Sequence, residues 1–500
     1  MRIAVVGAGT GGSTFAGTVA RLTGHEVVLL EAGPDYGPFG DLGWPAEIMD
    51  SRRIPQTHDW GLLNEDPRSG RRFELPRARI LGGCSAHNGC SAVRGLRSDF
   101  EAWQAAGGDF WSPDAFVADL EAVETALRVR RYAQDEITPY QQDVHAAALA
   151  AGFPVSQDIN DIDEGIGASI CPVNKIGGVR WNAAYAFVDP VRAQQNFAII
   201  DHFEVRELLF SSDRVSGVRG MRRGQALDID ADLVVLAAGA YGSPIILMRS
   251  GIGDAATLKS AGIAVRHELP GVGRNLQDHP CLILDFEATA QLIRRMQEFE
   301  SRSLAFDEGI IVKARSPLAE TPVDIHIFSC GGRRFEPAGW YWQLWVGLMT
   351  ARSRGQVRPL RDGANLRFAI EHDHLSDAAG LDARTLTWGV DMARRIATSD
   401  PLAGMLEREV APGRAVAGDA LAEWAHQNHV CYFHPAGSCA IGRNPAEGAV
   451  VDGMCRLHGL QGVMIADASV MPRITATNTN IPTAGLAYRL ARHIDEIRRS

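Results

Sequence analysis

The chain has 500 residues, of which 46% are hydrophobic and 22% charged, and its formal net charge is −10 with a pI of about 5.9. This length is too great for one ordinary core and predicts several domains, while the composition argues against a disordered chain. An acidic chain without a basic stripe or a polybasic patch excludes nucleic acid and a membrane surface as predicted partners.

The cysteines are scattered along the chain. No two of the eight have C-x-x-C spacing, so the sequence indicates neither a zinc site nor a redox dithiol, and no metal site is expected. Free thiols are typical of a reducing compartment, which predicts a cytoplasmic protein. The eight are Cys84, Cys90, Cys171, Cys281, Cys330, Cys431, Cys439 and Cys455.

The first residues, MRIAVVGAG, combine a basic residue with an apolar run, as a secretory signal would. The run is short and passes directly into a glycine pattern, so we expect a first β-strand instead. The best candidate for a membrane span, residues 233–248, is interrupted by Gly, Ser and Pro. It falls short of the about 20 apolar residues that a spanning helix needs, and we expect no membrane span.

A glycine-rich loop follows this first strand. The run IAVV, residues 3–6, is apolar and β-branched, as a buried parallel strand requires. Gly7, Gly9 and Gly12 fit G-x-G-x-x-G at the start of a predicted helix. In this motif the first glycine allows a tight turn, the second lets the backbone meet a pyrophosphate, and the third lets helix and strand pack closely. The helix N-terminus supplies free N–H donors for the anion.

A second strand, EVVLL at residues 26–30, ends at Glu31. A carboxylate at this distance from the glycines is placed to accept hydrogen bonds from a ribose diol. The complete strand–loop–helix–strand–acid unit therefore predicts a dinucleotide site, and the unit itself fits either NAD or FAD.

The middle of the chain has a different pattern. Residues 323–328 and 340–348 read as strands of a half-buried sheet, and residues 382–398 have helical periodicity. No dinucleotide motif occurs between about 286 and 430, so this region is the predicted substrate domain.

Six segments, in order, resemble the glucose–methanol–choline (GMC) oxidoreductases, an FAD-binding family. The segments are IAVVGAGTGG…LLEAGP (3–34), ARILGGCSAHNG (78–89), LAAGAYGSPIILMRSGIG (236–253), LPGVGRNLQDHP (269–280), YFHPAGSCAIG (432–442) and IADASVMPRITATNTNIPTAG (465–485).

The resemblance implies an α/β fold with a doubly wound, Rossmann-like FAD domain and a second, α+β domain whose antiparallel sheet covers the flavin. We expect the FAD domain at 1–285, with some excursions into the substrate domain, the substrate domain at 286–430, and a return to the FAD domain at 431–500. The cofactor contacts expected are Gly7, Gly9, Thr10, Gly11, Gly12, Glu31, Arg79, Gly83, His87, Asn88, Val205, Ala238, Asp467, Ala468 and Asn480.

The resemblance also assigns His434 and Asn478 as the pair that faces flavin N5. Imidazole suits removal of a hydroxyl proton near neutral pH while the hydride passes to the flavin. An amide N–H stabilises developing alkoxide charge without competing as a base. A packed core histidine is the alternative for His434, Asn480 is a competing candidate for the second position, and His429 is expected to be structural or to support the pair from behind.

His87 departs from most of the family, which carries an apolar residue at this place in G-G-x-S-x-x-N. The choline oxidases resemble the chain here, and in them this histidine is bonded to the C8-methyl carbon of the flavin. His87 is therefore a candidate covalent tether, which would raise the flavin potential. The alternative is a histidine packed against the dimethylbenzene edge; a metal role has no spaced partner.

The substrate side is less specified by the sequence. Trp60 and Phe433 fall where family members line their pockets with aromatic side chains. Four further aromatic residues fit either the pocket lining or the core of a sheet: Trp340, Tyr341, Trp342 and Trp345. Such a pocket suits a cationic alcohol, a sugar or an aryl alcohol.

The predicted function is FAD-dependent oxidation of a small-molecule alcohol, CH–OH to C=O, with oxygen or another electron acceptor. One alternative is a dehydrogenase that passes electrons to a quinone or a protein. Another is a hydroxynitrile lyase on the same scaffold, and a third is a flavin-binding protein without activity, which the intact His434–Asn478 pair disfavours. The oligomeric state stays open.

Overall fold

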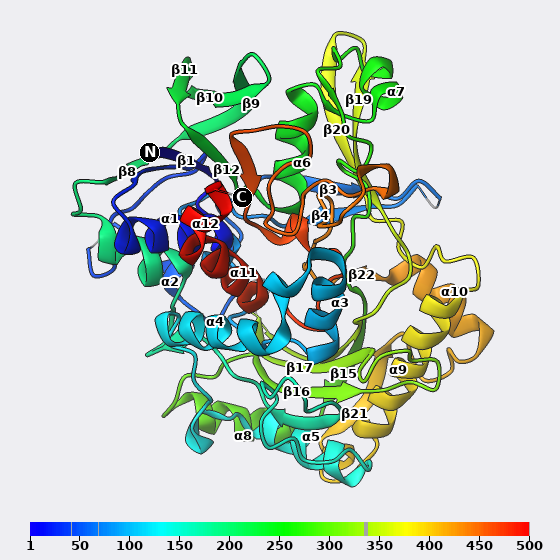
Figure 1. The fold of residues 1–500 in the computed structure, drawn as a ribbon. Helices are drawn as coiled ribbons and strands as arrows, with labels where there is room; N and C mark the ends of the chain where they lie inside the picture. The colour runs from blue at the N-terminus through cyan, green and yellow to red at the C-terminus, as the bar shows by residue number, and fades with distance from the viewer. Residues whose placement is uncertain (42, 69, 335–338, 500) are drawn as a thin grey trace.

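The computed structural model describes residues 1–41, 43–68, 70–334 and 339–499. A five-stranded parallel sheet, in the order β23–β12–β1–β2–β8, forms the centre of the first domain (Figure 1). Its strands are short, and apart from the edge strand β8 they are mostly buried, which explains their apolar sequences. They are β1 (Arg2–Val6), β2 (Glu26–Leu30), β8 (Phe197–Ile200), β12 (Leu233–Leu236) and β23 (Val463–Ile465).

Helices from both ends of the chain cover this sheet. Helix α1 (Thr10–Leu22) packs against α11 (Asn480–Arg492), and α4 (Pro113–Ala126) packs against α11 in turn. All three carry small or apolar residues on the faces that meet, and the resulting core is the largest in the molecule as described. The remaining helices of this part are α2 (Ala46–Met49), α3 (Arg97–Gly107), α6 (Gly239–Arg249), α7 (Ala255–Ser260) and α12 (Ile494–Arg499).

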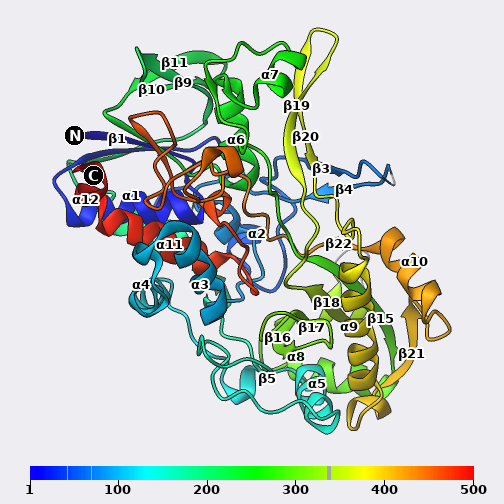
Figure 2. The same cartoon turned by 45° about the vertical axis from the view of Figure 1, so that its right-hand side comes forward.

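Smaller sheets flank the parallel sheet. An antiparallel sheet of β9 (Phe203–Ser211), β10 (Arg214–Arg222) and β11 (Gln225–Asp230) lies at one end (Figure 2). A mixed sheet is ordered β19–β20–β3–β4, with β20 and β3 parallel and the other pairs antiparallel. It comprises β3 (Leu62–Glu65), β4 (Arg72–Leu75), β19 (Gln356–Asp362) and β20 (Asn365–Glu371). Two strand pairs complete the set: β6 (Lys175–Ile176) with β7 (Val179–Arg180), and β13 (Ile252–Gly253) with β14 (His267–Glu268).

The second domain is built on an antiparallel sheet ordered β21–β15–β18–β17–β16–β5, with β22 paired to β15. Helices pack on one face of this sheet and bury a separate core (Figure 2). The strands are β5 (Gly167–Ile170), β15 (Pro280–Ala288), β16 (Glu308–Ala314), β17 (Ile325–Arg334), β18 (Gly339–Leu348), β21 (Leu406–Ala411) and β22 (Val430–Cys431). The helices are α5 (Pro139–Ala150), α8 (Ala290–Glu300), α9 (Leu381–Ala397) and α10 (Asp419–Asn428).

The expected fold class is confirmed, and the predicted elements lie within a few residues of the observed ones. The strands predicted at 323–328 and 340–348 are β17 and β18, and the helix predicted at 382–398 is α9. The 233–248 segment is strand β12 followed by helix α6. No helix among the described residues has the length and apolarity needed to cross a membrane.

The division into segments 1–285, 286–430 and 431–500 stays a prediction. Strand β5 belongs to the antiparallel sheet although it comes from the first segment, and β15 spans the expected boundary at 285.

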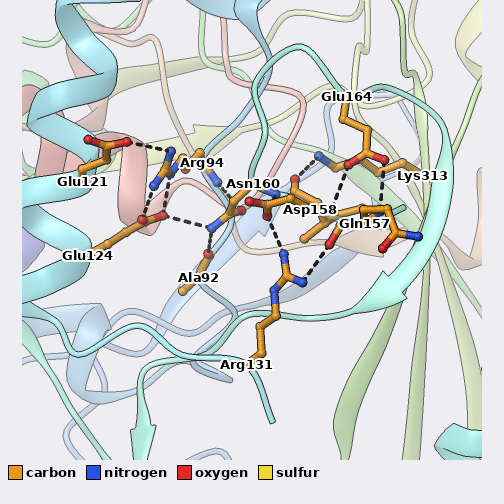
Figure 3. A network of polar contacts seen from close by, with 11 residues as sticks. Ala92, Arg94, Glu121, Glu124, Arg131, Gln157, Asp158, Asn160, Glu164 and Lys313 are labelled. Atoms are coloured by element: carbon orange, nitrogen blue, oxygen red, sulfur yellow. Dashed lines mark hydrogen bonds and ion pairs between the residues drawn. The ribbon is translucent and has the colours of Figure 1, made fainter. Parts of the chain in front are cut away.

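A polar network joins the two domains through the loop at 157–164 (Figure 3). On one side, Glu124 of α4 accepts two hydrogen bonds from the Arg94 guanidinium, at 2.8 and 2.5 Å, and one from Asn160 Nδ2 at 2.9 Å. On the other side, Lys313 of β16 donates to the carbonyl oxygen of Ile159 at 2.9 Å. The loop is therefore tied to a helix of one domain and to a strand of the other.

We expect Glu124→Gln to lower the free energy of unfolding by about 2 kcal/mol, because it leaves the Arg94 charge without its carboxylate in a mostly buried setting. The side chains of Arg94 and Glu124 are only 17% and 13% exposed. Denaturant unfolding followed by circular dichroism measures the change. Glu121→Gln is the matched control: Glu121 also reaches Arg94, but at 3.8 Å and with a side chain 61% exposed, so its loss should cost less than about 0.5 kcal/mol. Equal effects of the two substitutions would contradict the conclusion that the buried Arg94–Glu124 pair stabilises the protein more than the exposed Arg94–Glu121 pair.

Candidate active site

A cavity of about 870 Å³ lies between the carboxyl ends of the parallel strands and the inner face of the antiparallel sheet. Its walls come from the loop after β1, the first turns of α1, α6 and α11, and strands β16 to β18. This is the place where open α/β folds bind ligands. The volume fits an extended cofactor or a large substrate.

The glycine loop borders the cavity. The fold requires glycine at positions 7 and 12, but packing against the protein does not require it at position 9. Gly7 has φ +94°, and a side-chain carbon there would lie 2.6 Å from the Ala237 carbonyl oxygen. A carbon on Gly12 would lie 1.8 Å from the Gly7 carbonyl oxygen, so this glycine sets how closely α1 approaches β1. Gly9 has no protein atom nearer than 3.9 Å to such a carbon. The space beside Gly9 is therefore cavity, as a bound phosphate group would require.

Glu31 lies at the end of β2, beside this loop. Its two carboxylate oxygens accept hydrogen bonds from the backbone N–H groups of Ala8 and Gly33, both at 2.8 Å. Burial raises the pKa of Glu31 to about 7, although those two bonds favour the charged form. The carboxyl group keeps lone pairs directed at the cavity, where a diol could donate to them.

Three helices begin at the cavity, and their N-terminal N–H groups make it a favourable place for negative charge. Thr10 Oγ1, in the first turn of α1, donates to Asn480 Oδ1 in the first turn of α11 at 2.8 Å. Asn480 Nδ2 is buried and has no hydrogen-bond partner among the described residues. An unpaired buried amide is costly, so this group fits a site for a polar ligand.

Asp467 organises the third helix start. Its Oδ2 accepts from the Gly239 N–H at 2.8 Å and from Ser243 Oγ at 2.6 Å, while Oδ1 accepts from the Ser469 N–H at 2.8 Å. Burial raises the pKa of this carboxyl group, and its donors oppose that shift. Asp467 therefore holds α6 and the segment after β23 together at the cavity wall.

Most of the residues expected to contact the cofactor line this cavity. The exceptions are Gly12 and Arg79. Gly12 packs behind the loop, against the Gly7 carbonyl group. The Arg79 guanidinium lies 4.6 Å from the centre of the Trp60 ring and 3.5 Å from the Glu204 carboxylate. Those that line it are Gly7, Gly9, Thr10, Gly11, Glu31, Gly83, His87, Asn88, Val205, Ala238, Asp467, Ala468 and Asn480.

His434 and Asn478 meet on the cavity wall. Asn478 Nδ2 lies 3.2 Å from His434 Nε2, and both residues line the cavity. Asn480, the competing candidate for the second position, is instead bonded to Thr10. The structure thus separates the two asparagines: one faces the histidine and the other joins the helix starts.

A second histidine lies directly against the first. His279 Nδ1 lies 3.0 Å from His434 Nδ1, and His279 is fully buried. One of these nitrogens must donate to the other. When His434 Nδ1–H donates to His279, His434 Nε2 carries the lone pair and points to the cavity beside Asn478. This is the orientation that a base acting on a cavity ligand needs.

The backbone around His434 is held by charged groups. Asp278 Oδ1 accepts from the His434 N–H at 2.9 Å, and Arg77 Nη2 donates to the Phe433 carbonyl oxygen at 3.0 Å. Phe433 has φ +67°, a conformation that non-glycine residues rarely adopt. The strained residue directly before the histidine is thus fixed from both sides, as expected where a side chain must be aimed.

Burial also determines the charge of this group. Burial lowers the pKa of His434 well below its usual value, and the neighbouring His279 and Arg77 add to the shift. Burial raises the pKa of Asp278 to about 6. His434 is therefore a neutral imidazole at neutral pH, which is the form that accepts a proton.

His87 lines the cavity and is 6% exposed. Its Nε2 lies 2.9 Å from the Thr57 carbonyl oxygen, so Nε2 carries the proton and Nδ1 carries the lone pair. Burial lowers the pKa of His87 and keeps the ring neutral. A neutral imidazole with a free lone pair is compatible with both a packed histidine and a nucleophile.

The wall formed by the antiparallel sheet carries both aromatic and acidic side chains. Tyr341 and Trp345 of β18 line the cavity, whereas Trp340 and Trp342, on the opposite face of the strand, stack on each other at 5.6 Å and pack in the helix-covered core. Trp60 and Phe433 line the cavity as expected.

The acidic residues of this wall are Asp307 and Glu308, at the start of β16. Glu308 Oε2 accepts from Ser91 Oγ at 2.8 Å, and Tyr341 Oη donates to Asp307 Oδ2 at 3.1 Å. Burial raises the pKa of Glu308, and the charge of Asp307 adds to the effect. The buried Lys175 ammonium balances part of this negative charge.

The sequence analysis assigns no role to five of these residues: Arg77, Asp278, His279, Asp307 and Glu308. Asp278 and His279 lie in the segment LPGVGRNLQDHP, which was recognised as a motif without any role for its residues. Arg77 directly precedes the ARILGG motif. Glu308 had no sequence signal, because only strand pairing brings β16 to the cavity.

Comparison with known proteins identifies the family of the chain. Two family models described as GMC oxidoreductase match residues 1–281 and 351–487. Relatives align along the whole chain: an alcohol dehydrogenase [acceptor] from Pseudomonas putida at 29% identity over 97% of this chain and 94% of the relative, and a choline oxidase from Arthrobacter globiformis at 29% over 97% and 93%. An oxygen-dependent choline dehydrogenase from Paraburkholderia xenovorans is 30% identical over 98% and 93%.

Solved structures share the architecture. Pyridoxine 4-oxidase from Mesorbium loti superposes with a TM-score of 0.84 and 27% identity, covering 99% of both chains. Formate oxidase from Aspergillus oryzae has a TM-score of 0.87 at 20% identity, covering 99% of this chain and 98% of that chain, which shows a common fold. Because the family models and the relatives together span nearly all of its length, the chain belongs to the GMC oxidoreductase family, whose members bind FAD and oxidise CH–OH groups.

Proposed function

We propose that His434 is the base and Asn478 the orienting donor of an FAD-dependent alcohol oxidation. The observation that carries this is the 3.2 Å approach of Asn478 Nδ2 to His434 Nε2 on the wall of the cavity that also contains the glycine loop. When bound, FAD supplies the two-electron acceptor of the reaction. The chain itself must bind the alcohol, orient its oxygen and take its hydroxyl proton.

The proton has a defined destination. His434 Nε2 takes it, and the resulting imidazolium, which carries a proton on both nitrogens, donates from Nδ1–H to His279 Nδ1, 3.0 Å away. Asn478 Nδ2–H then becomes free to donate to the developing alkoxide oxygen, which stabilises negative charge without removing a proton. The buried setting strengthens both interactions, because water does not compete for them.

The residues present fit FAD. A pyrophosphate fits the open space beside Gly9 and the N–H groups of the three helix starts. The unpaired Nδ2 of Asn480 could donate to a polar group of the same cofactor. Glu31 is placed to accept from a ribose diol. The matched donors and acceptors span the cavity from the glycine loop to the His434 wall.

The substrate class that the wall supports is a small alcohol with an aromatic or cationic group. Tyr341 and Trp345 offer ring faces, and Asp307 and Glu308 provide negative charge beside them. The relatives named above include choline-oxidising enzymes and pyridoxine 4-oxidase, whose substrates have these features. We further propose a cytoplasmic location from the eight free cysteines, seven of which are buried, and oxygen as the first acceptor to test.

The glycine loop generates a test of cofactor binding. We expect Gly9→Ala to fold normally but to be purified with at most about a tenth of the parental FAD, because its methyl group has room in the protein but projects toward the phosphate position. Flavin absorbance per chain and circular dichroism measure the two properties. Gly12→Ala is the contrasting variant, since its methyl group strikes the Gly7 backbone, and it should reduce the yield of folded protein itself. A fully flavinylated Gly9→Ala protein would refute the assignment.

The reacting pair generates a kinetic test. Anaerobic mixing with a panel of choline, pyridoxine, benzyl alcohol and glucose should bleach the flavin with at least one alcohol. His434→Ala should then slow this reduction by at least about 10²-fold with FAD retained. Asn478→Ala should slow it less sharply, because a donor rather than the base is lost.

His426→Ala, on the outer face of α10, is the control and should reduce at the parental rate. Parental rates in His434→Ala would remove this residue from the mechanism. Turnover of a cyanohydrin without any bleaching would instead identify a lyase.

The position of His87 generates a test of the covalent tether. We expect flavin to remain with acid-precipitated wild-type protein and the intact mass to exceed the apoprotein mass by about one FAD. In that case His87 Nδ1, which carries the lone pair, would replace one hydrogen of the C8-methyl group, and the electron pair released would leave through the electron acceptor of the enzyme. His87→Ala should bind FAD without the bond, release it in acid and be reduced more slowly. Complete release of flavin from fresh wild-type protein would show that His87 only packs beside the ring.

A further inference from the structure

Two histidines and a cysteine converge behind the active-site wall. His372 and His374 follow β20, and Cys431 is the last residue of β22. One ligand atom from each of the three lies within 4.8 Å of the others. The two chain segments come from different sheets, so the cluster exists only in the folded protein.

Three of the four imidazole nitrogens of this cluster have no hydrogen-bond partner among the described residues. His372 Nε2 lies 2.7 Å from Tyr241 Oη, but its Nδ1 is buried without a hydrogen-bond partner among the described residues. His374 is more unusual, because neither of its buried ring nitrogens has a partner within that set. Each unpaired buried nitrogen costs free energy unless something occupies the space between the side chains.

We propose that His372, His374 and Cys431 bind one transition-metal ion of the Zn²⁺ class. Imidazole nitrogen and thiolate sulfur are the ligands that such ions prefer, and two histidines with one cysteine form a common donor set. Binding replaces the thiol proton of Cys431 with the metal and releases that proton to solvent, so no oxidant or reductant is needed. Small rotations of the side chains bring the three atoms to coordination distance.

Tyr241 supplies the supporting contact that metal-binding histidines usually have. If Nε2–H of His372 donates to Tyr241 Oη, then Nδ1 carries the lone pair that faces the cluster. Three protein ligands leave a fourth tetrahedral position for water or for His429, whose ring centre lies 5.4 Å from that of His374.

The charges around the cluster permit a cation. Arg77 lies close enough to His372 to act on it electrostatically and would oppose a metal, as would Arg71 on the side of His374. Burial raises the pKa of the Cys431 thiol, so its sulfur becomes a thiolate only when a metal displaces the proton. That thiolate and the carboxylate of Asp278, which lies beside Cys431, would then supply two negative charges in return. A divalent ion bound to one thiolate therefore adds only one net positive charge here.

A metal at this site would hold together the chain segments that form the active-site wall. Cys431 is three residues before His434, and Tyr241 lines the cavity while holding His372. A metal would join the end of β20, strand β22 and the first turn of α6. It would position these elements without touching substrate, so the role is structural and distinct from the proposed chemistry.

Metal analysis of the holoenzyme tests the proposal. Protein purified without chelator and reconstituted with Zn²⁺ should contain about one ion per chain, and Cys431→Ser and His374→Gln should each contain less than about a tenth of that. Co²⁺ loading should give thiolate-to-metal absorption that is absent from Cys431→Ser. Chelation should lower the Tm of the wild type by about 2 °C or more and leave that of Cys431→Ser unchanged.

Cys455→Ser is the matched control, because Cys455 is equally buried but lies outside the cluster, and it should retain the ion. If His374→Gln does not fold, the metal content and cobalt spectrum of Cys431→Ser decide the question. Wild-type protein that binds no more Zn²⁺ or Co²⁺ than Cys431→Ser would overturn the proposal. Full metal content in both cluster variants would overturn it as well, since the ion would then lie elsewhere.

Discussion

The close approach of α1 to β1 at Gly12 sets the geometry on which the active site depends. Because no side chain separates the helix from the Gly7 carbonyl group, the first turn of α1 opens directly onto the cavity. Thr10 in this turn is bonded to Asn480, which fixes the start of α11. Asn478 lies two residues before Asn480, so the same contact also determines where the amide that faces the histidine is found. A single backbone approach thus positions both the cofactor end and the reaction end of the site.

Burial then controls the chemistry of the groups brought together. His434 is neutral because desolvation and two nearby basic groups disfavour its protonation, and its Nε2 lies beside Asn478 while its Nδ1 contacts His279. Asp278 and Arg77 hold the strained backbone before it. Three contacts, from His279, Asp278 and Arg77, therefore hold the histidine and the backbone before it, so the site needs little reorganisation to receive a ligand.

The two faces of β18 show how one strand serves both the core and the site. Trp342 packs under helix α9, whereas Tyr341 and Trp345 on the other face meet the cavity. The alternation follows from the period of two in a β-strand. This alternation places Trp340 and Trp342 in the core and Tyr341 and Trp345 at the cavity, a choice that the sequence left open.

The sequence by itself determined the local, repetitive features of this protein. The glycine spacing, the apolar runs of the parallel strands and the periodicity of α9 depend only on nearby residues, and they predict the dinucleotide fold and its first acid, Glu31. The family resemblance added His434 and Asn478. Tertiary structure alone brought His279 behind His434, Glu308 to the cavity, and His374 beside Cys431, because these contacts join segments far apart in the chain. Sheet order and strand register decide such contacts, and no local pattern encodes them.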